Sequence, residues 1–213
     1  MIKGTQLEKR FHRNILKRRL LHIAASIIIM YYLLPKKLPY IGEKHYLLLA
    51  GLTLVIGIEL YRWYTAHYHP LDPLLREYEQ RRPASYVYFS VGSVILILLF
   101  PQYITIPCIL STAFCDPLIG IVRKKTKQCN AYILGFIVSF FLFAIVWLTT
   151  LWWIMLTASF LGASMIILAE YSSTLHLDDD LLMQLMPAII LFFLAQILLK
   201  SALPLPNQIL YPF

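Results

Sequence analysis

The chain has 213 residues, of which 59% are hydrophobic and only 14% are charged, and its formal net charge is +8. A soluble domain of this length is nearer half apolar and a quarter charged, so the composition excludes an ordinary soluble protein. The apolar residues form long uncharged blocks that approach the ~20 residues needed to cross a bilayer. We therefore expect an all-α, polytopic integral membrane protein.

The chain starts with a basic tail, residues 1–19, which lacks the apolar core and small-residue cleavage site of a signal peptide. Residues 20–213 are expected to form one transmembrane helical domain with about seven spans. In chain order the expected spans are Leu20–Leu34, Tyr46–Tyr64, Ser85–Phe100, Tyr103–Val122, two helices within Ala131–Ala169 that turn near Thr149 and Thr150, and Leu181–Ser201.

The distribution of Lys and Arg between these spans predicts the orientation of the chain. An N-terminus in the cytoplasm places 15 of the 19 basic residues inside and four outside, which is a strong positive-inside signal. Anionic lipid headgroups suffice as partners for the basic loops, so no nucleic acid is expected. The acidic residues near the span ends then lie toward the cytoplasm, where nucleotides are found.

The most informative run is AFCDPLIGIVRKK, residues 113–125. Asp116 lies inside a predicted span, where a carboxylate without a partner costs a few kcal/mol. Pro117 removes a backbone donor and bends the helix. Mg²⁺ in proteins binds one or two carboxylates together with phosphate oxygens, and the basic residues Arg123, Lys124 and Lys125 could neutralise those phosphates. The alternative is a kinked helix that ends in an ordinary cytoplasmic basic loop.

Three consecutive aspartates, Asp178, Asp179 and Asp180, precede the last expected span. One aspartate is enough to cap a helix and to interact with the positive end of its dipole. A bound cation would relieve the repulsion among three, and Glu170 at the end of the preceding span could join it. The predicted metal ligands are therefore Asp116, Asp178, Asp179 and Glu170, and helix capping alone is the alternative.

Weaker signals come from three charged segments and three cysteines. The segments contain Arg18, Arg19 and His22; Glu59 and Arg62; and Arg76, Glu77, Glu79, Arg81 and Arg82. Their plainer interpretations are interfacial anchoring, an intrahelical ion pair and a solvated surface. Cys108, Cys115 and Cys129 show no metal-ligand spacing and are expected to pack as apolar residues. The chain lacks a glycine-rich phosphate loop, a zinc-binding histidine pair and a nucleophile elbow, so serine, cysteine and metalloprotease chemistry has little support.

In this order the motifs resemble those of the polyprenol kinase family, which includes dolichol kinase, phytol kinase and CTP-dependent diacylglycerol kinases and is distantly related to phosphatidate cytidylyltransferases. The similar segments are Arg18–His22, Glu59–Arg62, Arg76–Glu79, Tyr88–Gly92, Cys115–Asp116 with Arg123–Lys125, and Glu170 with Asp178–Leu181. The chain departs from the family pattern at Cys115, where glycine is common, at Asp180, where asparagine is usual, and at Lys127–Tyr132, which replaces a K-S-x-x-G-S run.

The resemblance implies a kinase that transfers the terminal phosphate of CTP, with Mg²⁺, to an isoprenoid alcohol, a polyprenol or diacylglycerol at the cytoplasmic face. On this basis the catalytic candidates are Asp116, Asp179 and Glu59, the phosphate-binding candidates are Arg123, Lys124, Lys125, Arg19 and Arg76, and the further motif residues are Arg18, His22, Arg62, Glu79 and Asp180. A cytidylyltransferase that forms a CDP-lipid and a non-catalytic membrane protein remain the alternatives. The nucleotide base, the acceptor lipid, the identity of the catalytic base and association with a second copy stay open.

Overall fold

The computed structural model of the chain describes residues 17, 19–39, 42–65, 79, 82–172 and 178–207, and most of them are helical. The elements are a helix at Arg19–Leu33, whose second half is the 3-10 helix η1 (Ser26–Leu33), then β1 (Lys37–Leu38), β2 (Gly42–Glu43), α2 (Lys44–Thr65), α3 (Ser85–Leu99), α4 (Gln102–Val122), α5 (Gln128–Trp147), α6 (Trp152–Ser172) and α7 (Asp179–Lys200). Of the predicted basic tail, only Lys17 and Arg19 lie within the described residues.

Five helices, α2, α4, α5, α6 and α7, are long and apolar enough to cross a membrane, which supports a multi-pass, all-α protein. The helix at Arg19–Leu33 and α3 are apolar but shorter, so the expected seven spans are matched by five helices of full length. Proline explains the short helices, because Pro35 follows the first, and Pro83 and Pro101 bound the second. The 3-10 turns stretch the first helix to ~26 Å, close to the thickness of a hydrocarbon core.

The uncharged block at Ala131–Ala169 forms the predicted helical hairpin. α5 ends at Trp147 and α6 begins at Trp152, and the turn between them contains Thr149 and Thr150, as expected. The indole Nε1 of Trp147 donates to the carbonyl of Tyr103 at 3.1 Å. That carbonyl lies four residues before Pro107 and therefore lacks its helical donor. The bond fixes α5 against α4. It also gives the Tyr103 carbonyl a hydrogen-bond donor, which lipid could not provide.

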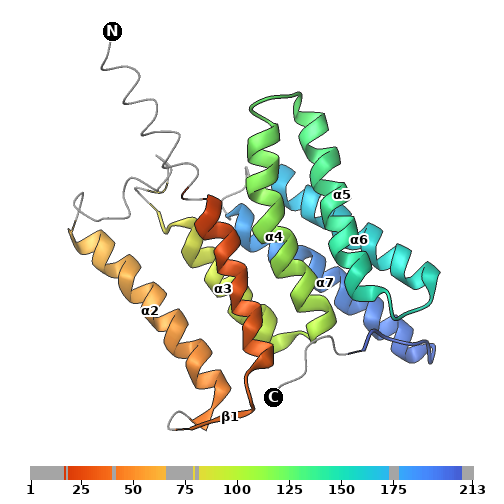
Figure 1. Cartoon of the computed structure of the whole chain (residues 1–213), viewed down its shortest axis with the longest axis horizontal. Helices are drawn as coiled ribbons and strands as arrows, with labels where there is room; N and C mark the ends of the chain where they lie inside the picture. Colours follow the sequence, from red (N-terminus) through yellow and green to blue (C-terminus); the bar gives the residue numbers. More distant parts are fainter. Residues whose placement is uncertain are drawn as a thin grey trace.

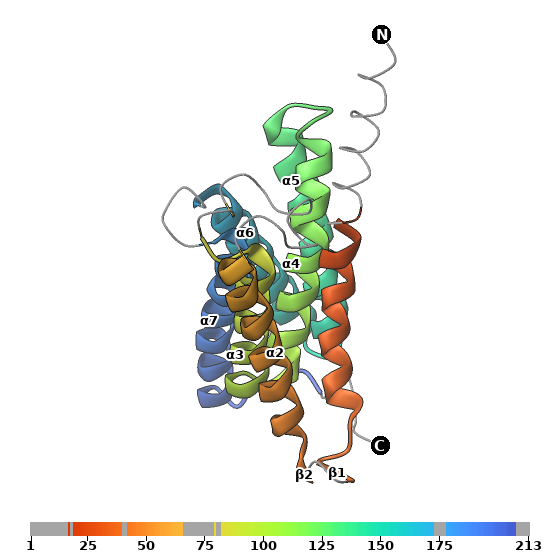
Figure 2. The same ribbon diagram turned by 90° about the vertical axis from the view of Figure 1, so that its left-hand side faces the viewer.

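Helix α4 lies at the centre of the bundle and α2 at its edge (Figure 1). α4 contacts η1, α3, α5, α6 and α7, whereas α2 packs chiefly against α3. Both views place the β1–β2 hairpin and the α4–α5 connection at opposite ends of the bundle (Figures 1 and 2). The α4–α5 connection carries Arg123, Lys124, Lys125 and Lys127, whereas the hairpin end carries Lys36, Lys37, Glu43 and Lys44.

A polar contact inside the bundle joins α3 to α7. The amide Nε2 of Gln184 donates to the carbonyl of Phe89 at 3.2 Å, and the hydroxyl of Ser93 donates to Gln184 Oε1 at 3.3 Å. Gly92 permits this approach, because a Cβ there would lie 2.5 Å from Gln184 Oε1. The first turns of α7, which carry two of the aspartates, are thereby held against α3.

Candidate functional site

Acidic residues from α4, α6 and the start of α7 converge at one place in the bundle. Asp116 lies on α4 and Glu170 near the end of α6, while Asp179 lies in the first turn of α7. One carboxylate oxygen from each of these three residues lies within 4.8 Å of the other two. Three residues predicted as metal ligands are thus brought together from distant parts of the sequence.

These oxygens suit a hard divalent cation. Oxygen ligands of one Mg²⁺ lie ~2.1 Å from the ion and hence at most ~4.2 Å apart. Small side-chain rotations would therefore be enough to close the group of Asp116, Glu170 and Asp179 around such an ion. The donor set contains only carboxylates, which favours Mg²⁺, Mn²⁺ or Ca²⁺ over softer metals.

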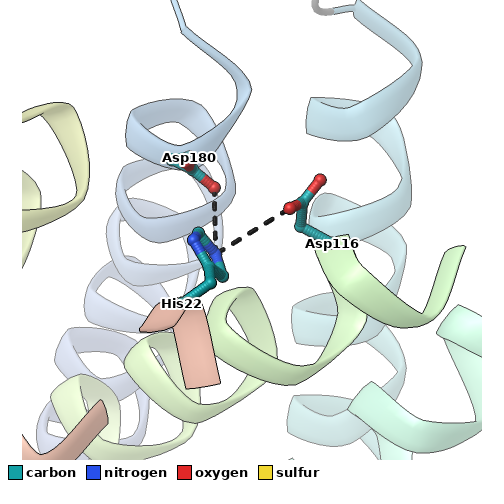
Figure 3. Close-up of side chains that lie close together, drawn as sticks. All are labelled: His22, Asp116 and Asp180. Carbon is teal, nitrogen blue, oxygen red and sulfur yellow. Dashed lines mark ion pairs between the residues drawn. The ribbon is translucent and has the colours of Figure 1, made fainter. Parts of the chain in front are cut away.

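A second group contains His22, Asp116 and Asp180 (Figure 3). His22 Nε2 lies 3.2 Å from Asp180 Oδ1 and 3.9 Å from Asp116 Oδ2. The imidazole also packs edge-on against Phe89, with ring centroids 5.1 Å apart. Asp180 is only 1% exposed, so the histidine partly offsets the cost of burying that carboxylate. Asp116 belongs to both groups and links them.

Asp178 caps α7 with one carboxylate oxygen and buries the other. Its Oδ1 accepts a hydrogen bond from the backbone N–H of Asp180 at 3.1 Å, which caps α7. Its Oδ2 is buried and has no hydrogen-bond donor among the described residues. Burial, together with the charges of Asp180 and Asp179, raises the pKa of Asp178 to about 8. Asp178, Asp179 and Asp180 each offer a carboxylate oxygen within 4.8 Å of the other two, and a nearby cation would favour the ionised form of Asp178.

Basic side chains approach the acidic groups from two directions. Arg123 Nη1 lies 3.4 Å from Glu170 Oε1, and the Arg123 side chain is 49% exposed. Arg19 reaches α4 at Gly120, where an added Cβ would lie 3.7 Å from its Nη2. Gly120 is four residues after Asp116 and therefore on the same helical face. Lys124 and Lys125 are exposed in the α4–α5 connection. Arg19 and Arg123 are thus the predicted phosphate ligands nearest the acidic groups.

Glu59, Arg62 and Glu79 form a separate cluster, which we call the α2–α3 joint. Glu59 accepts from Arg62 Nε at 2.9 Å and Nη2 at 2.6 Å, from the backbone of Ala84 at 3.1 Å and from the hydroxyl of Tyr86. Glu79 is buried and accepts from the backbone and hydroxyl groups of Ser85. Glu59 belongs to none of the three groups of possible metal ligands found within the described residues. Its contacts tie the end of α2 to the start of α3.

The cysteines divide between the core and the surface. Cys115 Sγ lies 3.0 Å from Ser139 Oγ and 3.5 Å from the carbonyl of Gly135, so it faces α5 rather than the acidic groups. Cys108 is buried as well, as predicted for apolar packing. The prediction was wrong for Cys129, which is exposed because it lies in the first turn of α5, beside the basic connection.

Arg18 and Arg76 lie outside the described residues, so their predicted roles stay predictions. Gln184 and Phe89, which hold α7 and His22 against α3, were not among the predicted site residues. Gln184 carried a signal, since it is an amide within a long apolar stretch. For Phe89 the sequence contains no signal apart from its place in the Tyr88–Gly92 segment.

Comparisons of the chain with protein-family models, with curated proteins and with solved structures found no match.

Proposed function

We propose that the chain is a membrane lipid kinase that transfers the terminal phosphate of a nucleoside triphosphate, CTP by the family resemblance, to the hydroxyl group of a lipid alcohol. The observation that carries this proposal is the position of Asp116 in two adjoining groups. The group of Asp116, Glu170 and Asp179 contains only carboxylates and suits a metal ion that binds phosphates. The other group contains His22, whose imidazole can accept a proton. Phosphoryl transfer to a hydroxyl group can use both functions side by side.

On the nucleotide side, Asp116, Glu170 and Asp179 would hold Mg²⁺, with Asp178 next to them. The ion, when bound, neutralises charge on the phosphates. Arg19, whose guanidinium group lies beside Gly120 of α4, would bind phosphate oxygens. Arg123 is half-exposed and only 3.4 Å from Glu170, so it can turn from that carboxylate to a phosphate. Lys124 and Lys125 would add positive charge that attracts the nucleotide.

On the acceptor side, His22 would orient the lipid hydroxyl group. Its Nε2 lies 3.2 Å from Asp180, a buried carboxylate that fixes the ring and stabilises its protonated form. The hydroxyl oxygen would attack the terminal phosphorus, its proton would pass to Nδ1 of the imidazole, since Nε2 faces Asp180, and the bond to the bridging oxygen would break to release a nucleoside diphosphate. We assign Glu59 a structural role, because its carboxylate is engaged at the α2–α3 joint.

We further propose that both short helices also cross the membrane, giving seven spans, and that the site faces the cytoplasm. The basic α4–α5 connection follows Asp116 by less than two helical turns, and such residues are enriched on the cytoplasmic side. At the other end of the bundle, the start of α6 carries the exposed side chains of Trp152 and Trp153. Tryptophans commonly lie at a membrane interface, which supports a boundary at that end.

The proposal is tested with purified protein in nanodiscs, Mg²⁺, and CTP, ATP or GTP labelled at the terminal phosphate. Farnesol, phytol, dolichol and diacylglycerol are offered in turn. We expect labelled lipid with CTP, and we expect EDTA to abolish it. Absence of labelled lipid under every condition would overturn the kinase. Release of pyrophosphate in place of a nucleoside diphosphate would identify a cytidylyltransferase instead.

A further inference from the structure

An apolar groove lies between the N-terminal helix and α2, with α3 beneath it. Its volume is about 350 Å³, which is within the range of small-molecule sites. Its base includes the buried side chains of Tyr31, Leu48 and Val94, and its rim includes the exposed side chains of Ile27, Met30 and Leu47. The groove is therefore open on its side, toward the hydrocarbon that would surround a membrane-spanning helix.

The groove presents little that a polar ligand could bind. Its lining contains two hydroxyl groups, those of Tyr31 and Ser90. The Tyr31 hydroxyl lies 2.7 Å from His45 Nδ1, and the Ser90 hydroxyl donates to the carbonyl of Tyr86 at 2.8 Å. Both hydroxyls already have partners, so a hydrocarbon occupant would leave neither of them unsatisfied. The lining fits an alkyl or isoprenoid chain and not a sugar or a nucleotide.

One end of the groove lies close to the acceptor side of the proposed site. Ser90 lines the groove, and the adjacent Phe89 contacts the His22 ring at a centroid distance of 5.1 Å. On the N-terminal helix, Ile27 follows His22 by about 8 Å along the axis. From Ile27 the groove continues to Leu34, a further ~14 Å. A chain in this groove would direct its head toward His22.

We propose that the groove binds the hydrocarbon chain of the acceptor and that the acceptor is a lipid alcohol with a single chain, not diacylglycerol. This inference rests on the proposed function of the acidic site. A groove of about 350 Å³ between two helices holds one chain, so diacylglycerol would have to leave its second chain outside the groove. Because the side of the groove is open at Met30, which is 54% exposed, the tail of a longer polyprenol can continue into the bilayer.

Two glycines of α2 provide a matched pair of variants. Gly51 lines the groove, and an added Cβ there would meet no heavy atom within 4 Å. Gly51→Leu therefore adds side-chain volume at the groove, and its Cβ meets no neighbouring atom. Gly57 lies on the same helix, is equally open to a larger side chain and is not among the groove-lining residues. Both substitutions replace glycine inside a helix and have the same favourable effect on helix propensity.

The test is photoaffinity labelling of the full chain in phosphatidylcholine nanodiscs. The probe is geranylgeraniol with a diazirine at its tail, and adducts are located by mass spectrometry. We expect adducts on the groove-lining parts of the N-terminal helix and α2. Unlabelled geranylgeraniol should compete for them and diacylglycerol should not. Gly51→Leu should reduce the competed labelling by about tenfold, equivalent to 1.4 kcal/mol, and Gly57→Leu should leave it unchanged.

Labelling that geranylgeraniol does not displace would identify an ordinary membrane-lipid chain in the groove and overturn the inference. Equal labelling of Gly51→Leu and Gly57→Leu, or equal competition by diacylglycerol, would also overturn it. Labelling needs no turnover, so its outcome is independent of the kinase assay. Competed groove labelling without any lipid phosphorylation would refute the proposed function alone. If both proposals hold, Gly51→Leu raises KM for the alcohol and leaves KM for the nucleotide unchanged.

Discussion

Asp116 is the residue at which the two halves of the site meet. It shares one group of atoms with Glu170 and Asp179 and another with His22 and Asp180. Asp116→Asn keeps the size of the side chain and removes its charge. We expect kcat/KM for lipid phosphorylation to fall about 100-fold or more, and the Mg²⁺ concentration for half-maximal rate to rise. Initial rates measured over a Mg²⁺ titration check both effects.

Glu43→Gln is the matched control for that substitution. Glu43 is an exposed carboxylate on β2, at the end of the bundle opposite the α4–α5 connection (Figure 2). Neutralising it changes the net charge by the same amount, but it contacts neither acidic group. Full activity in Asp116→Asn would refute the assigned site even if the protein proved to be a lipid kinase.

Asp178 makes the stability of the metal-free protein depend on pH. Its pKa is raised from 3.8 to about 8 in the folded chain, so the folded state holds a proton that the unfolded state has already lost. This contribution is fully present below pH ~4 and is lost as pH rises toward 8. We expect the thermal midpoint in EDTA to fall across this window. Mg²⁺ should raise the midpoint more at pH 8 than at pH 6, because metal and proton compete for the carboxylates.

Asp178→Asn separates this effect from helix capping, since asparagine caps a helix as well as aspartate does. The variant should keep the fold, show a flatter dependence of the thermal midpoint on pH and gain less from Mg²⁺. Differential scanning fluorimetry in detergent measures each midpoint. An unchanged pH profile in Asp178→Asn would mean that another group dominates the titration.

At the scale of the helices, the α2–α3 joint holds the end of α2 against the start of α3. Glu59 and Arg62 are each only 5% exposed, and Arg62 Nη2 also donates to the carbonyl of Arg82 at 3.1 Å. Breaking a buried pair leaves an uncompensated charge. We therefore expect Glu59→Gln to lower the free energy of unfolding by about 3 kcal/mol. The shift is measured as a lower thermal midpoint in detergent.

The double variant Glu59→Gln with Arg62→Met provides the control. It removes both charges, so it should lose less stability than the sum of the two single variants. The specific activity of the folded fraction should survive in all three. A stable Glu59→Gln protein without activity would instead support the catalytic role that the motif pattern suggests for Glu59.

The positions of the helices could be predicted from the sequence more reliably than the contacts between the helices. Long apolar runs must become helices in lipid, where every backbone group needs an internal partner, so the hairpin turn near Thr149 was predictable. The spacing of Glu59 and Arg62 predicted their pairing within one helix. The contacts of that pair with Ala84 and Tyr86 were not predictable, because they depend on how two helices dock.

The same distinction applies to the candidate site. Span topology predicted that Asp116, Glu170 and Asp179 would lie toward one face, since each is near the same end of its span. The pairing of His22 with Asp180 joins residues almost at the two ends of the chain, and no local pattern encodes it. The groove beside Gly51 results from sparse packing between the first helix and α2, which composition does not reveal.

At the scale of the whole molecule, the two ends of the bundle carry different residues, and this asymmetry predicts the orientation in the membrane. Cys129 is exposed beside the basic α4–α5 connection, whereas Cys108 and Cys115 are buried. A membrane-impermeant maleimide should therefore label Cys129 in inside-out vesicles and not in intact cells. Cys129→Ser should abolish labelling from both sides.

The reciprocal variant places the only exposed thiol of the described residues at the opposite end. Glu43 is exposed on β2, so Cys129→Ser with Glu43→Cys should be labelled in intact cells and protected in inside-out vesicles. Together the two variants report each end of the bundle independently. Labelling of Cys129 in intact cells would reverse the topology. It would place Asp116 and its neighbours on the outer face, where nucleoside triphosphates are scarce, and the kinase proposal would then fail with the orientation.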